Sequence, residues 1–182
     1  NLRTALMLVM FAILLFYYPL KFILDIWLPA YKDALVFMAL IFPMSVYEGK
    51  MALVINTYLK AMRMEKDILK INALVMLTSM VVTLVTTLLL NNLGLTVVSI
   101  VILLALRSII AELILSKKLK ISVKQDIALE LLMTIIFLSS SWYLSIWIAV
   151  IIYLLAYTLY LYLKHKDIRM YIEYFKNHKK IS

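Results

Sequence analysis

The feature that most limits how this chain can fold is the length of its apolar segments. The longest of them, Leu131 to Leu163, contains no charged residue. As one helix it would extend about 50 Å, whereas the hydrocarbon core of a bilayer is about 30 Å thick. We therefore expect two membrane-spanning helices there, a short one over Ile127 to Ser140 and a second over Trp142 to Leu163. Ser139 to Ser141 would supply the turn between them.

Four further apolar segments precede this region. Their lengths are close to the roughly 20 residues that a spanning helix needs. Two segments with turn signals, Trp27 to Asp33 and Asn91 to Gly94, separate neighbouring spans. The expected spans are about Thr4 to Leu24, Ala34 to Leu59, Ile68 to Leu90 and Leu95 to Leu115.

Composition agrees with a membrane protein. Apolar residues make up 65% of the chain and charged residues 16%, whereas a soluble domain is about half apolar and about a quarter charged. This balance excludes a soluble enzyme and a disordered chain. No segment alternates as barrel strands do. The sequence therefore predicts an all-α integral membrane protein, a bundle of about six transmembrane helices over residues 1–163.

The basic residues predict the orientation of the bundle. If alternate connections are assigned to the same side, 15 of the 19 Lys and Arg residues fall on one side. Such a bias marks the cytoplasmic side, so we expect both ends of the chain in the cytoplasm and an even number of spans. Because the net charge of +9 has this explanation, nucleic acid is not an expected partner.

We single out four of the ionisable residues inside expected spans, where such residues are costly and usually functional. They are Glu48 and Lys50 in the second span and Arg107 and Glu112 in the fourth. Lys50 lies about ten residues, or roughly 15 Å, from the cytoplasmic end of its helix. We expect Lys50 and Arg107 either to line a wet cavity, which we favour, or to form structural ion pairs. Glu48 and Lys50 should face different directions, and Pro43 should kink their helix.

Glu112 is one turn from the basic loop at Lys117. We expect it to be an interfacial residue or a partner of a nearby basic side chain.

Catalytic and cofactor-binding patterns are missing from the sequence. The two histidines, His165 and His178, are both in the tail, and there is no cysteine. The motifs of zinc proteases, serine hydrolases and phosphate-binding loops do not occur. We therefore expect no enzyme activity, no cofactor and no metal site.

Residues 164–182 form a basic tail that we place in the cytoplasm. Ile168, Tyr171, Ile172 and Phe175 follow helical spacing among Lys and Arg residues. This pattern indicates a short amphipathic helix on anionic lipid. A solvated charged tail is the alternative.

In the order of several motifs, the sequence resembles a known family, the polysaccharide (oligosaccharide-lipid) flippases of the Wzx type. This family belongs to the multidrug/oligosaccharidyl-lipid/polysaccharide exporter superfamily. The similarity is to the C-terminal half of these proteins and covers residues 2–118, while the last two spans match in number alone. The motifs are Ile26 to Ala34, Ile41-Phe42-Pro43, Asn56 to Lys66, Asn72, Asn92 to Leu95, Arg107 with Glu112, and Lys117-Lys118.

The resemblance implies the C-terminal lobe of a two-lobed transporter in a bacterial inner membrane. Its substrate would be an undecaprenyl-pyrophosphate-linked oligosaccharide used for capsule, O-antigen or another surface polysaccharide. The cationic cavity of the family would correspond to Lys50 and Arg107 here, and the missing partner would be an N-terminal lobe that precedes Asn1. Glycine is scarce around the fourth of these helices, where family members often have it.

Two other classes of function stay open. The chain would otherwise be a non-transporting accessory or scaffold protein of an envelope-assembly complex, or an integral-membrane transferase with an unrecognised site.

Overall fold

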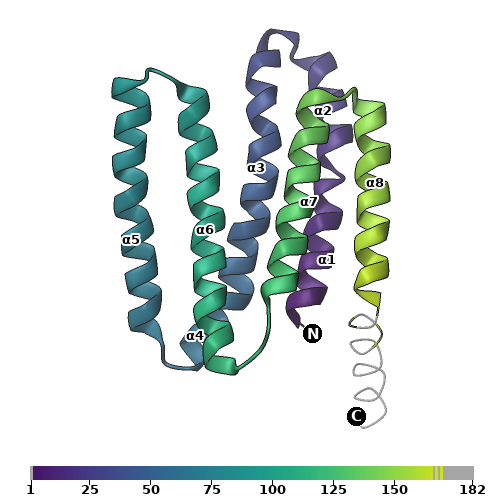
Figure 1. Cartoon of the computed structure of the whole chain (residues 1–182). Helices are drawn as coiled ribbons and strands as arrows, with labels where there is room; N and C mark the ends of the chain where they lie inside the picture. Colours follow the sequence, from purple (N-terminus) through teal and green to yellow (C-terminus); the bar gives the residue numbers. More distant parts are fainter. Residues whose placement is uncertain (1, 166, 168, 170–182) are drawn as a thin grey trace.

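The computed structural model describes residues 2–165, 167 and 169. Over these residues, six helical segments are long and apolar enough to cross a membrane (Figure 1). This confirms the prediction of an all-α membrane bundle. The spans are Arg3–Trp27, Ala34–Ala61, Glu65–Leu89, Leu93–Leu119, Lys124–Tyr143 and Ile146–Leu163.

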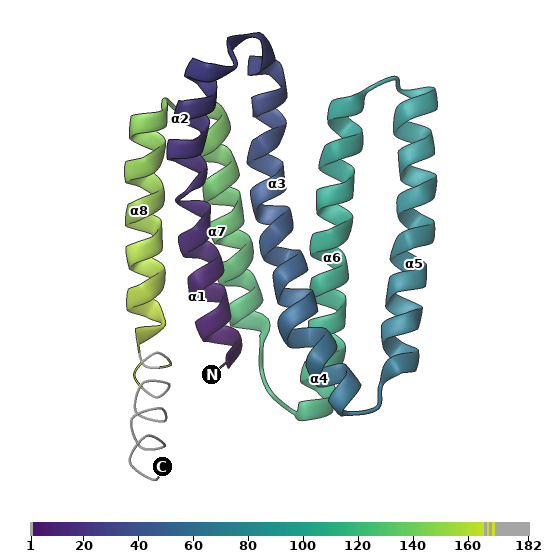
Figure 2. The same ribbon diagram turned by 180° about the vertical axis from the view of Figure 1, so that it is seen from behind.

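Several spans are divided into shorter elements. The helices are α1 (Leu2–Leu14), α2 (Tyr17–Trp27), α3 (Lys32–Lys50), α4 (Asn56–Ala61), α5 (Glu65–Leu84), α6 (Leu93–Leu119), α7 (Lys124–Tyr143) and α8 (Ile146–Leu163). A 3₁₀ turn, η1 (Pro29–Tyr31), precedes α3, and two π-helical segments, η2 (Met51–Ile55) and η3 (Val85–Leu89), follow α3 and α5. The start of α1 and the end of α8 lie at the same end of the bundle (Figures 1 and 2).

The first span is interrupted between α1 and α2. Pro19 has no N–H group and cannot donate the usual helical hydrogen bond to Leu15. The carbonyl of Leu15 instead accepts from the amide of Tyr18 at 3.3 Å, one residue closer than in an α-helix. The proline therefore tightens the preceding turn without ending the span.

The turn between the last two spans does not lie where we expected it. The expected turn, Ser139 to Ser141, is inside α7, and the chain turns at Leu144 and Ser145. The Ser140 hydroxyl donates to the carbonyl of Phe137 at 3.0 Å, within its own helix. Since serine can satisfy its polar group in this way, a serine run need not end a helix in a membrane.

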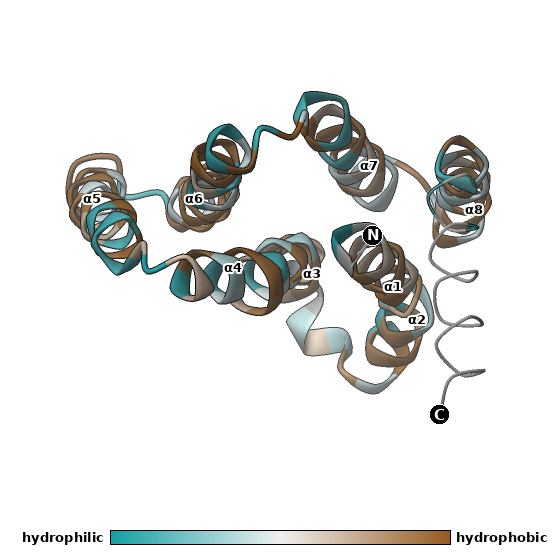
Figure 3. Cartoon of the chain, turned by 90° about the horizontal axis from the view of Figure 1, so that it is seen from below, coloured by the Kyte–Doolittle hydropathy of each residue, from teal (hydrophilic) through white to brown (hydrophobic). Residues whose placement is uncertain are grey.

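The helices form two rows when the bundle is seen along its axis (Figure 3). One row contains α5, α6, α7 and α8, and the other contains α4, α3, α1 and α2. α6 packs against α3 and α5, and α7 packs against α8 and α3, but α6 and α7 make few contacts with each other.

The buried apolar side chains form two separate clusters. The first core joins α1, α2, α3, α7 and α8 around residues such as Phe11, Phe137 and Tyr153. The second core joins η2, α4, α5 and α6 around residues such as Met51 and Leu115. The second span therefore belongs to both cores, and the junction between α3 and η2 lies where it passes from one to the other.

Candidate functional site

Lys50 is the last residue of α3 and occupies the junction between the two cores. Its side chain is fully buried. Its ammonium group forms ion pairs with Glu112 on α6 and with Glu130 on α7, the latter at 2.5 Å. Because a buried charge is tolerated only when it is paired, these two carboxylates explain how a lysine can lie this deep.

Arg3, at the start of α1, pairs with the same two carboxylates from the other side. Its guanidinium group contacts Glu112, lies 2.6 Å from Glu130 and lies 2.9 Å from Asp126. The planar group has five donors in a fixed arrangement. Arg3 therefore connects α1 with both α6 and α7.

The network continues outward to Lys164, directly after α8. Lys164 pairs with Asp126 and, at 3.1 Å, with Asp167. Burial alone would lower the pKa of Lys164, but hydrogen bonds to these two carboxylates outweigh it and raise the pKa above the usual lysine value. The ammonium group therefore stays charged.

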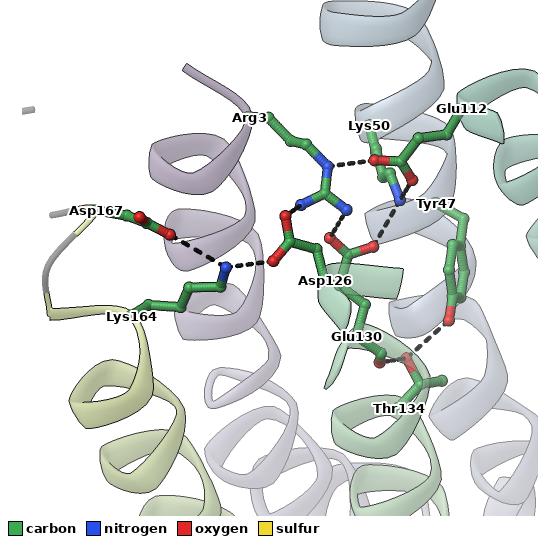
Figure 4. Close-up of polar contacts among 9 residues, drawn as sticks. All are labelled: Arg3, Tyr47, Lys50, Glu112, Asp126, Glu130, Thr134, Lys164 and Asp167. Carbon is green, nitrogen blue, oxygen red and sulfur yellow. Dashed lines mark hydrogen bonds and ion pairs between the residues drawn. The ribbon is translucent and has the colours of Figure 1, made fainter. Parts of the chain in front are cut away.

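We call these seven residues the ion cluster: Arg3, Lys50, Glu112, Asp126, Glu130, Lys164 and Asp167 (Figure 4). Its members come from α1, α3, α6 and α7 and from the segment after α8. It contains three cations and four carboxylates, and Asp167 is the most exposed member. The cluster thus joins the two rows of helices by electrostatic contacts.

Two uncharged side chains support the turn of α7 that contains Glu130. The hydroxyl of Tyr47 lies 3.0 Å from that of Thr134, and Thr134 donates to the carbonyl of Glu130 at 2.9 Å (Figure 4). Tyr47 is on α3, one turn before Lys50. The Tyr47–Thr134 hydrogen bond therefore links α3 to α7 beside the ion cluster.

A second charged site lies apart from the ion cluster. Arg107 on α6 and Glu48 on α3 form an ion pair, with 2.8 Å between the Nη2 and Oε2 atoms. Each residue lies about midway along its span. The two side chains keep 21% and 38% of their surface exposed, in contrast to the fully buried Lys50. A charged pair at this depth must face either lipid, water or another protein.

A cavity of about 420 Å³ lies beside the ion cluster. Arg3, Glu112 and Asp126 form part of its polar wall, and Val54, Ile55 and Leu115 form part of its apolar wall. The cavity therefore lies between α6 and α7, and residues of both helices form its walls.

The candidate residues that we selected by sequence analysis belong to two different sites in the structure. Glu48 and Lys50 face different partners, as their spacing predicts. Lys50 forms buried ion pairs, which corresponds to the second alternative for this residue, while Arg107 is both paired and partly exposed. Pro43 lies inside α3, and its kink stays a prediction.

Glu112 is a partner of basic side chains, the second of the two alternatives expected for it. It is 3% exposed and pairs with Arg3 and Lys50, not with the basic loop that follows it.

Sequence reasoning missed Arg3, Asp126 and Glu130 as members of one site. Arg3 was one of the basic residues counted for the orientation, and neither Asp126 nor Glu130 was singled out. One signal was present: Asp126 and Glu130 are four residues apart, so they lie on the same face of a helix. A lysine deep in one span and two carboxylates on one face of another are complementary.

Among the residues that the structure describes, no group of three or more His, Cys, Asp or Glu side chains is arranged to hold a metal ion. The predicted amphipathic pattern of the tail, Ile168 to Phe175, lies almost entirely outside the described residues. Comparison of the chain with family models, curated proteins and solved structures found no match.

Proposed function

We propose that this chain is part of a membrane transporter, the C-terminal half of a Wzx-type flippase. In this proposal it moves undecaprenyl-pyrophosphate-linked oligosaccharide across a bacterial inner membrane, with both ends of the segment in the cytoplasm. The motif resemblance and the one-sided distribution of basic residues support it. Alternating access would move the lipid-linked sugar without covalent change.

The observation that carries the proposal is the exposed ion pair of Glu48 and Arg107. A charged side chain at the bilayer centre costs about 2.5–3.5 kcal/mol on insertion scales. Both side chains keep part of their surface uncovered at that depth. We infer that a water-filled pathway, closed on its far side by an N-terminal lobe, covers this surface in the whole transporter.

Arg107 is the residue to which we assign substrate contact. One nitrogen, Nη2, binds Glu48, and Nε is buried without a hydrogen-bond partner among the described residues, while the side chain as a whole keeps 21% of its surface exposed. The guanidinium group therefore has donors left for the oxygens of a pyrophosphate. Glu48 would hold Arg107 in position until the anionic substrate competes for it. Lys50 would act through the ion cluster instead, because its charge is already shared by two carboxylates.

Complementation of a flippase-null strain tests the proposal. Residues 1–182 expressed alone should insert into the membrane but fail to export glycan, and co-expression with a matching N-terminal half should restore export. In the complete transporter, Arg107→Ala should reduce export at normal protein abundance. Lys118→Ala, a control on the same helix in an exposed position, should not.

Each result decides between classes of function. Export by residues 1–182 alone would contradict the half-transporter proposal. Normal export by Arg107→Ala at normal abundance would remove the assigned substrate contact. Failure of the two halves together to restore export would favour an accessory or scaffold protein.

A further inference from the structure

The α5–α6 hairpin and α4 are connected to the rest of the bundle in few places. In the first place, α6 packs along α3, and Arg107 of α6 pairs with Glu48 of α3. In the second, Glu112 of α6 pairs with Arg3 and Lys50. Over the described part of the chain, Arg3–Glu112 is the one ion pair or side-chain hydrogen bond that joins α6 to α1, α7 or α8.

The helix that both cores share changes its geometry at this point. α3 ends at Lys50, and the next five residues, η2, are π-helical before α4 begins. Single-turn π segments inside long helices are frequent at functional sites and are a common cause of bends. Gly49, directly before Lys50, is closely approached by α1: an added Cβ atom would lie 2.6 Å from the Cε atom of Met10.

The cavity beside Glu112 leaves space for α6 to move. The 420 Å³ cavity separates the η2, α4 and α6 wall from the α1 and α7 wall, and Glu112 lines it. Since α6 and α7 make few contacts with each other, a movement that separates α6 from α7 while α6 stays packed on α3 disturbs little apolar packing.

The partners of Glu112 allow it to be released. If Glu112 moves away, Arg3 keeps its ion pairs with Asp126 and Glu130, and Lys50 keeps its ion pair with Glu130. Neither cation is therefore left unpaired in the interior. The carboxylate that leaves is five and six residues before the exposed residues Lys117 and Lys118 and borders the cavity.

We propose that Arg3, Lys50 and Glu112 form a releasable latch, and that α4, α5 and α6 turn as a unit about η2 when Glu112 separates from the two cations. Opening widens the cavity between α6 and α7 at the end of the bundle where α1 begins. The inference is independent of what the chain transports. It concerns movement within this chain and not movement between two lobes.

Cysteine accessibility in lipid nanodiscs tests the latch, because the chain contains no native cysteine. The reporter is Val54→Cys in η2, at a side chain that is 4% exposed and lines the cavity. The probe is a water-soluble maleimide, which reaches both faces of a nanodisc. We expect Glu112→Gln to raise the labelling rate of this reporter on the order of tenfold or more, since removing one partner of a buried ion pair shifts an equilibrium by at least that factor.

Two controls separate opening from unfolding. Ala149→Cys on α8, in the first core and 1% exposed, should stay unreactive in the Glu112→Gln background. Glu48→Gln makes the same chemical change in the other α3–α6 ion pair and should leave labelling of Val54→Cys unchanged.

A distance measurement gives an independent readout. Spin labels can be placed at Met76 on α5 and Leu155 on α8, which are both exposed. We expect the distribution of distances between them to be broader in the Glu112→Gln protein than in the protein that retains Glu112, or to be shifted relative to it. An unchanged labelling rate together with an unchanged distance distribution would overturn the proposal. Equal gains in labelling at positions 54 and 149 would also overturn it, because they would show general loss of packing.

Discussion

Replacing Lys50 by methionine removes one positive charge from the interior and keeps a side chain of similar length. In the structure this ammonium group is fully buried and pairs with Glu112 and Glu130. After the substitution, both carboxylates depend on Arg3 for charge compensation. Breaking a buried pair by removing one partner costs about 3–5 kcal/mol. We therefore expect the unfolding equilibrium to shift by a factor of roughly 10² to 10⁴.

Unfolding in mixed micelles with increasing denaturing detergent, followed by circular dichroism, measures this loss. Lys118→Met is the matched control, since it removes a lysine from an exposed position on α6 and should leave the midpoint unchanged. Adding Glu130→Gln to Lys50→Met should recover part of the loss, because one uncompensated carboxylate is then neutral. The two substitutions should couple by about 0.5–3 kcal/mol, as residues in contact do.

The result that would refute this reasoning is a Lys50→Met protein as stable as the control. Lys50 would then contribute nothing net to folding, and the ion cluster would not hold the two cores together. A loss that Glu130→Gln leaves fully additive would also contradict the assigned pairing.

Three further expectations follow from the described contacts. Thr96→Val should cost about 0.6 kcal/mol in detergent unfolding, the average for an interhelical hydrogen bond in a membrane, because its hydroxyl meets the two threonines of η3. Gly49→Ala should be nearly neutral, since the flexible end of Met10 can move aside, whereas Gly49→Leu should cost about 1–3 kcal/mol by overpacking. Reporter fusions after Lys120 should report cytoplasm and fusions at Asn91 the opposite side; the reverse result would invert the proposed orientation.

The fold could be predicted from the sequence because it depends on segment length. Apolar segments of spanning length and the need to satisfy backbone groups inside a bilayer leave a helical bundle. The turn between the last spans was misplaced, because Ser140 satisfies its hydroxyl within α7 by bonding to Phe137. Local sequence pattern does not reveal such a bond.

The candidate site was only partly predictable. The depth of Lys50 in its span showed that it needed a carboxylate or water, but the sequence could not identify the carboxylate. Glu112 and Glu130 are 62 and 80 residues from Lys50 in the chain, and only helix packing brings them together. The partners of Arg3 could not be identified either, since an arginine near the end of a span is usually an orientation signal.

The proposed substrate pathway requires that water reach the Glu48–Arg107 pair in the whole transporter. Ser45 is exposed and lies three residues before Glu48, on the same side of α3. In the complete protein, Ser45→Cys should react with a membrane-impermeant thiol reagent, and bound lipid-linked oligosaccharide should slow that reaction. Leu155→Cys, exposed at similar depth on α8, should stay unreactive in lipid. If Ser45→Cys is as inert as Leu155→Cys, this face of the bundle contacts lipid or protein, and the proposed substrate pathway does not pass Arg107.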